Sequence, residues 1–477
     1  MPRPARLRSV TRMTMLPLFD AALIERYDRP GPRYTSYPSA LQFDERFDEA
    51  AYRAAAERSR AARPGAPLSV YVHVPFCASP CFYCGCSRII TRQFDRAEPY
   101  VSALEREAAL QGALFERTRA IEQLHFGGGT PTFLSPPQLR RVMDALDREF
   151  GLSDSEQREY SIELDPRTVH TATLAELAGL GFNRISLGVQ DFDPQVQKAV
   201  NRIQSVKDTL DLITQARELG FRSVSVDLIY GLPYQSRESW TRTLDIIATA
   251  APDRIAAYSY AHLPERFKAQ RHIDRTKLPT AREKLGLLAL TIERFTAAGY
   301  DYIGMDHFAL PGDELAQARR SGTLHRNFQG YSTRGGLDLV GLGMTSIGQL
   351  DDTYSQNARQ LDRYYAAVNH GRLAIEKGMR VSAEDQLRRD VVMALMCRDG
   401  LRFADIETAH GIRFTEHFAA ELERLRPLED DGLVRRDPAG LRVTPSGRLL
   451  LRAIAMVFDA YALPPAADAP RRHSAVI

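Results

Sequence analysis

Residues 72–86 read VHVPFCASPCFYCGC and hold four of the five cysteines of this 477-residue chain. Disulfides explain the run poorly, because cysteines this close in sequence cannot all pair without strain. A structural zinc site normally takes two separated cysteine pairs, and the fifth cysteine, Cys397, stands alone far downstream. The C-x3-C-x2-C spacing of Cys77, Cys81 and Cys84 suits a 4Fe–4S cube instead, since three thiolates each bind one iron and the fourth iron stays open. Zinc remains the alternative, and the role of Cys86, just beyond this loop, stays open.

The residues around the cysteine loop have the pattern of a parallel α/β sheet. Segments with strand composition occur at residues 68–74, 121–126, 160–164, 184–189, 223–230 and 255–260. Helical patterns separate them, for example at residues 100–115, 172–180, 206–219 and 240–250. This alternation predicts βα units around a parallel sheet, and six units are too few to close an eight-unit barrel.

Three helices of this region are expected to end on the same short motif. It reads LGF at residues 180–182, LGF at 219–221 and AGY at 298–300. Glycine there supplies the left-handed residue that ends a helix. We expect the aromatic ring that follows to pack beneath the sheet.

Polar and glycine-rich residues follow the predicted strands at their carboxyl ends. Each has an ordinary explanation when taken alone, because an acid after a strand usually caps a helix and a glycine triplet without Lys-Ser/Thr is usually a turn. In barrels, however, the chemistry sits at the carboxyl ends of the strands, so their shared position predicts one site. These residues are the cysteine loop, the GGGT of residues 127–130, Glu163, Asp165, Gln190, Asp191, Asp227, Ala261 and His262.

The pattern changes after about residue 330, so we expect a barrel at residues 67–330 and a mainly helical domain at residues 331–477. A helical pattern at residues 414–425 precedes strand patterns at 433–436 and 441–444, an arrangement that resembles a winged helix. That helix carries three glutamates against one arginine, and anionic DNA would not favour such a face. We therefore expect a lid or scaffold, with no nucleic-acid partner.

Charge and hydropathy exclude further classes. Sixty-three basic residues nearly balance 60 acidic ones, which gives no general case for nucleic-acid binding. The best apolar candidate, residues 449–463, is shorter than the roughly 20 residues of a membrane span and contains Arg452 and Asp459. It therefore predicts an amphipathic helix and no membrane span. Residues 1–19 hold four arginines and no acid, and we expect a disordered extension, with an organelle transit peptide as the alternative.

Taken together, the motifs give the chain a specific resemblance from about residue 20 onward. It resembles the oxygen-independent coproporphyrinogen III oxidases of the radical S-adenosylmethionine (SAM) superfamily. The motifs that carry the resemblance are PRYTSYP at residues 32–38, the cysteine run to Cys86, HFGGGTPT at 125–132, NRISLGVQDF at 183–192, DLIYGLP at 227–233, GMDHF at 304–308 and HRNFQGY at 325–331.

The resemblance implies a fold and a reaction. The fold is an α/β open six-unit (βα)6 partial TIM barrel with an amino-terminal segment. The reaction is the conversion of two propionates of coproporphyrinogen III to vinyl groups, which gives protoporphyrinogen IX without oxygen. The cofactors are one 4Fe–4S cluster and two SAM molecules, which provide a 5′-deoxyadenosyl radical for hydrogen abstraction. A cytoplasmic monomer is implied, with a flavodoxin-like or ferredoxin-like electron donor and an electron acceptor that the sequence does not name.

The resemblance also assigns residues, motif by motif. It makes Cys77, Cys81 and Cys84 the cluster ligands. It makes Tyr71, His73, Glu163 and Ile347 the candidate catalytic residues, with His73 facing the mouth of the cluster. The SAM on the cluster would contact Tyr71, Gly128, Glu163 and Ile347. The second SAM would contact Tyr83, Gly129, Thr130, Gln190, Arg202, Asp227 and Ala261.

The amino-terminal motif has two interpretations. We expect residues 20–66 to form a lid segment whose Arg33 pairs with a substrate carboxylate, while Tyr34 and Tyr37 exclude water at the barrel mouth. The alternative is that residues 32–38 merely anchor the terminus. A haem-trafficking chaperone of the same superfamily is the alternative function. As such proteins usually lack the Cys86 equivalent and the YTSYP segment, both of which are present here, the decarboxylase is favoured.

Overall fold

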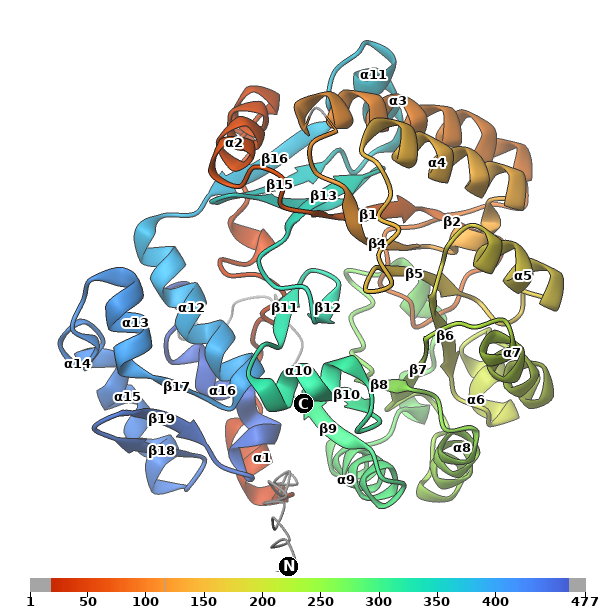
Figure 1. Ribbon diagram of the computed structural model, residues 1–477. Coiled ribbons are helices and arrows are strands. Elements are labelled where there is room, and N and C mark those ends of the chain that lie inside the picture. Colours follow the sequence, from red (N-terminus) through yellow and green to blue (C-terminus); the bar gives the residue numbers. More distant parts are fainter. Residues whose placement is uncertain (1–18, 116, 463–477) are drawn as a thin grey trace, which may run out of the picture.

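A computed structural model describes residues 19–115 and 117–462 and contains a long curved sheet (Figure 1). Its strand order is β16-β15-β14-β13-β1-β4-β5-β6-β7-β8-β10-β9. Neighbouring strands from β1 to β8 pair in parallel, which confirms the six-unit core. The bounds are β1 (Leu68–Val74), β4 (Ile121–Gly128), β5 (Glu159–Leu164), β6 (Arg184–Gln190), β7 (Ser223–Tyr230) and β8 (Arg254–Ser259).

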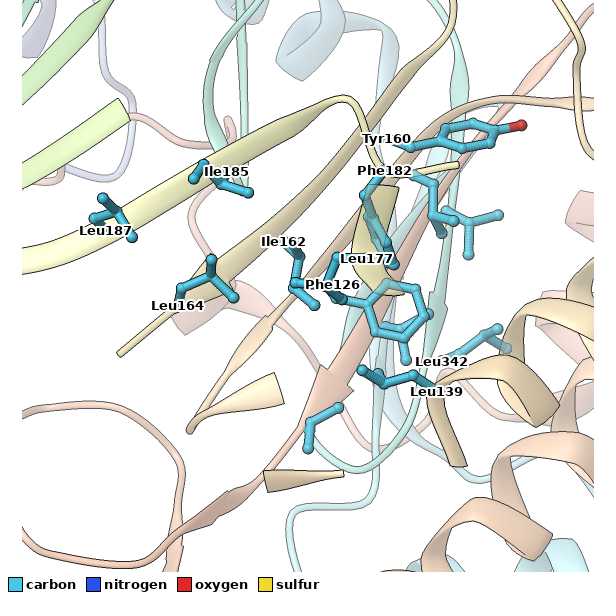
Figure 2. Close-up of a cluster of buried hydrophobic side chains, with 14 of the residues drawn as sticks. Phe126, Leu139, Tyr160, Ile162, Leu164, Leu177, Phe182, Ile185, Leu187 and Leu342 are labelled. Atoms are coloured by element: carbon cyan, nitrogen blue, oxygen red, sulfur yellow. The ribbon is translucent and has the colours of Figure 1, made fainter. Parts of the chain in front are cut away.

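Helices cover the outer face of this sheet because each strand is apolar on that side. On β4, Leu124 and Phe126 are fully buried, whereas His125 between them faces the barrel interior side chains of β1 and β5. Figure 2 shows Phe126, Ile162 and Leu177 within the resulting core. The covering helices are α3 (Ala97–Phe115), α4 (Pro136–Glu149), α5 (Thr171–Gly179), α6 (Pro194–Ala199), α7 (Val206–Glu218), α8 (Arg237–Ala250) and α9 (Ala281–Ala297).

The glycine motif has the structure that the sequence predicts. Gly181 and Gly220 follow α5 and α7 with φ of 92° and 83°, values that L-residues with a side chain rarely adopt. The aromatic rings that follow, Phe182 and Phe221, are buried in the core. The motif thus ends each helix and attaches the next strand to the sheet.

The predicted domain boundary at residue 330 is wrong, because the sheet continues beyond it. Strand β13 (Asp338–Leu342) pairs in parallel with β1 on the side opposite β4. The antiparallel strands β14 (Ile347–Leu350), β15 (Thr353–Asn357) and β16 (Ile375–Arg380) extend that edge. The short apolar DLVGL strand lies inside a glycine-rich stretch, which hides its strand character in the sequence. The other edge carries β9 (Asp301–Gly304) and β10 (His307–Ala309).

Most of the remaining carboxyl-terminal residues form a second hydrophobic core, whereas α11 packs on α3 in the main core. The helical pattern at residues 414–425 is divided at Phe418 into α14 (Phe414–His417) and α15 (Ala419–Asp430). A three-stranded sheet in the order β17-β19-β18 supplies the predicted hairpin. The bounds are α10 (Glu314–Ser321), β11 (His325–Asn327), β12 (Gly330–Ser332), α11 (Leu361–Asn369), α12 (Ala383–Arg398), β17 (Gly400–Arg402), α13 (Phe403–His410), β18 (Val434–Asp437), β19 (Gly440–Val443) and α16 (Leu451–Met456).

The amphipathic helix expected at residues 449–463 is shorter, and its polar residues are not exposed. Helix α16 ends at Met456, and Arg452 and Asp459 are buried. Both residues bind the amino-terminal segment. Arg452 donates to the carbonyls of Gly31 and Pro32, and Asp459 accepts a 2.9 Å hydrogen bond from the Tyr34 hydroxyl.

This contact corrects the lid prediction for the tyrosines. Tyr34 and Tyr37 lie in the carboxyl-terminal core and do not line the barrel mouth, because their hydroxyls bond to Asp459 and to the Ala460 amide. The segment also contains α1 (Ala21–Tyr27) and α2 (Glu49–Ala62), and α2 packs on α3 within the main core. Among the described residues, no helix is long and apolar enough to cross a membrane. The expected extension at residues 1–19 falls outside the described residues except for its last position.

Candidate active site

The cysteine loop is fixed at its base and along its length. After β1, strand β2 (Phe76–Cys77) pairs in parallel with β3 (Ile89–Ile90), which closes the loop. The Arg88 guanidinium lies within the loop and donates to the carbonyls of Cys84 at 3.0 Å and Cys81 at 3.4 Å. The side chains of the loop are thereby directed to the carboxyl ends of the barrel strands.

One cavity of about 510 Å³ joins the cysteine loop to the ends of β4, β5, β6 and β7. The four thiols of the loop face it together with the glycine-rich end of β4. The structure therefore brings most of the predicted site residues together. Those lining the cavity are Cys77, Cys81, Cys84, Tyr83, Gly128, Gly129, Thr130, Glu163, Gln190, Arg202 and Asp227.

The end of β4 lies so close to the cysteine loop that only glycine fits. A Cβ at Gly129 would stand 2.7 Å from the Phe76 carbonyl oxygen, and one at Gly128 would stand 2.6 Å from the His73 ring. Thr130 follows and donates to the Cys77 sulfur at 3.4 Å. The GGGT motif is thus a backbone wall against the thiols, and not a phosphate loop.

The arrangement of the thiols in the loop fits an iron–sulfur cube. A hydrogen bond from Cys86, together with the nearby Arg88 guanidinium, outweighs burial and lowers the pKa of Cys84 to about 6. A thiol of this kind is ionised near neutral pH, as a metal ligand must be. Burial, by contrast, raises the pKa of Cys77 to about 11. The fit to an iron–sulfur cube therefore rests on geometry, because three thiols on one short loop face one cavity and each can bind a separate iron.

Glu163 is a carboxylate of the cavity that stays ionised. Its carboxylate accepts hydrogen bonds from His125 Nε2 at 3.1 Å and from the Gly128 amide at 3.2 Å. Burial raises its pKa, but the His125 and Gly128 hydrogen bonds outweigh burial and hold the pKa below its ordinary value. The ring of Tyr71 stacks on His125 with centroids 5.8 Å apart and supports this pair from below. The Glu163 side chain still has 45% of its surface exposed, so it is open to a ligand.

Asp227 differs from Glu163 in having few donors. Within residues 19–115 and 117–462, the one hydrogen bond that its carboxylate accepts comes from the Ser186 hydroxyl at 3.3 Å. Burial, and next the negative charge of Glu163, raise its pKa to about 7. The two carboxylates thus share one cavity with different protonation behaviour, Glu163 ionised and Asp227 titrating near neutrality.

We predict that Asp227→Asn changes how stability depends on pH. A carboxyl whose pKa rises on folding destabilises the folded chain as pH climbs from its unfolded value of 3.8 to about 7. The cluster-free variant should match the parent protein at pH 4 and exceed it at pH 8 by on the order of 2 kcal/mol, less than the full shift implies because cavity water screens the charge. Urea denaturation at both pH values measures this. An equal difference at both would contradict it.

The Arg202 guanidinium already has partners within the protein. Its guanidinium contacts both carboxylate oxygens of Asp165 at 3.3 Å, the Gly188 carbonyl, and the Cys81 sulfur at 3.4 Å. Arg167 pairs with the same carboxylate at 2.6 Å. A ligand carboxylate that reached Arg202 would therefore have to compete with Asp165.

Five residues assigned by the resemblance do not line the cavity, and neither do the predicted rim residues Gly127, Asp191 and His262. Tyr71 and His73 lie beneath it and are joined by a 3.0 Å hydrogen bond from the Tyr71 hydroxyl to Nδ1 of His73. Ile347 packs beside Phe43 and Tyr354, and Ala261 uses its carbonyl to accept from Gln270 at 3.2 Å. Arg33 enters the barrel elsewhere. It forms an ion pair with Asp306, and its guanidinium carbon lies 5.6 Å from the centroid of the Tyr258 ring.

The sequence analysis missed other residues of the site. Arg167 lines the cavity, Arg88 shapes the loop, and His125 and Ser186 hold the two carboxylates. Asp165, which the sequence predicts at the carboxyl ends of the strands, also lines the cavity. His125 belongs to the HFGGG motif, but the sequence does not indicate its contact with Glu163. Nothing in the sequence signals that Arg88 turns back into the loop.

Comparison with known proteins agrees with this geometry. The chain matches the model of the radical SAM superfamily over residues 71–247 and that of the HemN C-terminal domain over residues 381–450. It is 50% identical over 443 residues to the oxygen-independent coproporphyrinogen III oxidase of Pseudomonas aeruginosa, covering 93% of this chain and 96% of that one. The enzyme of the same name from Escherichia coli K12 is 47% identical over 443 residues, covering 93% of this chain and 95% of that one.

A solved structure gives the same result. It is described as coproporphyrinogen III oxidase (HemN) from Escherichia coli, a radical SAM enzyme. The two structures align with a TM-score of 0.89 at 46% identity, over 93% of this chain and 99% of that chain.

Proposed function

The chain belongs to the oxygen-independent coproporphyrinogen III oxidases, which are radical SAM enzymes, and we propose that it converts two propionates of coproporphyrinogen III to vinyl groups. The product would be protoporphyrinogen IX. The observation that carries the proposal is the single cavity in which three thiols with C-x3-C-x2-C spacing face the GGGT wall and Glu163. When bound, the 4Fe–4S cluster and SAM supply a carbon-centred radical that removes hydrogen from the substrate.

A product assay tests this function against the haem-chaperone alternative, which family membership disfavours. Anaerobic, cluster-loaded protein with SAM, a reductant and coproporphyrinogen III should release two carbon dioxides per substrate and form the divinyl product. Failure of decarboxylation under these conditions, with the cluster intact, would refute the proposal.

The chain's own residues have distinct tasks in this proposal. Cys77, Cys81 and Cys84 hold the cluster, and Gly128 and Gly129 let it lie against the backbone. The ionised Glu163, held by His125, accepts hydrogen bonds from the SAM on the cluster. Tyr71 and His73 would support the bound SAM from below the cavity. Ile347, at the start of β14, would contact the same SAM molecule.

A second SAM would occupy the other half of the cavity. Tyr83, Thr130 and Gln190 line the cavity and would contact this SAM, and Asp227 would suit its ribose hydroxyls. We propose that the SAM carboxylate replaces Asp165 as the partner of Arg202, since an arginine pairs with one carboxylate at a time in bidentate geometry. The Ala261 carbonyl, held by Gln270, lies on the same side of the loop because Gln270 also binds the Tyr83 carbonyl.

We predict that Arg202→Lys separates the two SAM molecules. The cluster absorption should persist, because Lys retains a positive charge near Cys81, but SAM stoichiometry should fall from two to one and vinyl formation by about 100-fold or more, since the bidentate pair is lost. Equilibrium binding of labelled SAM and product analysis measure this. Lys198→Gln, an exposed change on α6, is the matched control. Unchanged stoichiometry and turnover would remove Arg202 from the SAM site.

We further propose a flavodoxin-like or ferredoxin-like electron donor, and a monomeric, cytoplasmic enzyme. Gly85 and Cys86 are exposed, so the cysteine loop reaches the surface. Next to it, Phe267 contacts Gly85 and lies among exposed basic residues, namely Arg266, Lys268 and Arg271. Such a surface attracts an acidic partner.

A further inference from the structure

A second cavity of about 1140 Å³ lies between the barrel and the carboxyl-terminal domain. Strands β1, β4, β13 and β15 form one wall, and α12, β17 and β19 form the other (Figure 1). The cavity shares no lining residue with the cavity at the cysteine loop. It is also about twice as large, so a bulkier ligand fits there.

The charges of this cavity are predominantly positive. Eight arginines line it against four aspartates, and it has no lysine or glutamate in its lining. Arg398 and Arg442 form no ion pair with any residue in the described part of the chain. Arg320 pairs with Asp301, and Arg334 pairs with Glu122 and Glu159, all of which lie outside the lining. The positive charge that remains unpaired, on Arg398 and Arg442 above all, indicates an anionic ligand.

Buried arginine nitrogens in this wall have no protein partner. Arg326 has only 8% of its surface exposed, and its Nη1 has no hydrogen-bond partner among the described residues. The same holds for Nη1 of Arg389 on α12. Leaving a buried guanidinium donor unsatisfied is costly, so these two groups suit carboxylate oxygens of a ligand.

The lining of the interdomain cavity also contains apolar side chains. Leu339, Met393 and Leu441 come from three different elements of the wall. A ligand that suits this lining has an apolar body and several anionic groups at its edge. A tetrapyrrole with four propionates has that form.

The amino-terminal segment reaches both the interdomain cavity and the interior of the barrel. Thr35 and Ser36 line the interdomain cavity, while Arg33 in the same segment pairs with Asp306 inside the barrel. Arg326 Nε donates to the Arg33 carbonyl at 3.3 Å and links the two sides. A ligand in the interdomain cavity would therefore lie next to the segment that also reaches the interior of the barrel.

We propose that the interdomain cavity is a docking site for the tetracarboxylate tetrapyrrole, separate from the reaction cavity, and this rests on the proposed function. The experiment is fluorescence titration of the cluster-loaded enzyme with coproporphyrin III, which keeps the four carboxylates but is already oxidised. Arg389→Gln/Arg398→Gln/Arg442→Gln should weaken binding by about tenfold or more, because three charged partners are lost. The control Arg372→Gln/Arg435→Gln changes exposed arginines outside the cavity and should have no effect.

Two further arms locate the site. The tetramethyl ester of coproporphyrin III should bind poorly to the parent enzyme, because its charges are blocked. Arg33→Gln/Asp306→Asn should weaken only coproporphyrin binding inside the barrel, where that pair lies, and should leave the binding that depends on Arg389, Arg398 and Arg442 unchanged. Equal binding by the triple variant and the control, equal binding of the ester, or loss only in the Arg33 variant would each overturn the docking site. Arginine-dependent binding without decarboxylation would refute the proposed function and leave the docking site standing.

Discussion

Replacing Cys77, Cys81 or Cys84 by serine should abolish the iron–sulfur cluster and decarboxylation together. Each thiolate holds a different iron, and no other thiol of the described chain can replace it without moving the loop, which β2–β3 pairing and Arg88 hold in place. Anaerobic reconstitution should give about four irons per parent chain and a much lower value in each variant. Activity should fall by at least about 1000-fold, since no radical forms. Iron content, absorption spectra and product analysis measure these effects.

Cys86→Ser is the matched control for these three variants. Cys86 lines the same cavity, but it is exposed and lies beyond the three-cysteine spacing. Its amide contacts the Cys84 sulfur at 3.4 Å, a contact that serine at position 86 retains. The variant should keep the cluster. Zinc in place of iron in the parent, or cluster loss in Cys86→Ser, would refute the ligand assignment.

The sequence predicts the barrel well because its signals are local. Each of the six parallel strands is a short apolar run with glycine or polar residues at its end, and all six predicted starts lie within one residue of the observed ones. The sequence does not predict strand β13, because this segment becomes a strand only by pairing with β1, which is distant in sequence. The break at Phe418 escaped for a similar reason, since the ring is buried among Phe414 and Phe458 by tertiary packing.

The residues of the candidate site also fall into two groups, those that local sequence signals predict and those that only tertiary contacts place. Residues fixed by the ends of strands, such as Glu163 and Asp227, were found because the fold rule places them at one rim. Asp165 as the partner of Arg202 could not be found, because an ion pair across two loops leaves no mark in the sequence. The lid prediction failed for Tyr34 and Tyr37 because their buried hydroxyls needed partners, and Asp459 and Ala460 supply them.

Arg33 remains the candidate for binding a substrate carboxylate, and its environment sharpens the test. Deletion of residues 1–38 would uncover the carboxyl-terminal core that Tyr34 and Tyr37 complete, so loss of activity in that truncation would have two explanations. A point substitution avoids this. The Arg33 side chain has 35% of its surface exposed and that of Asp306 has 13%, so the arginine of this pair is open to a ligand inside the barrel.

Arg33→Gln should reduce decarboxylation by about 100-fold or more while cluster content and SAM binding stay normal, because the substrate loses a charged partner that positions it. SAM cleavage should continue without product. The same variant leaves Asp306 unpaired and should lower stability by about 1–3 kcal/mol. Arg33→Gln/Asp306→Asn removes the unpaired charge, so it should recover stability but not decarboxylation. Denaturation midpoints and the ratio of vinyl product to 5′-deoxyadenosine measure the two effects. Recovery of turnover in the double variant would show that Arg33 serves only to neutralise Asp306.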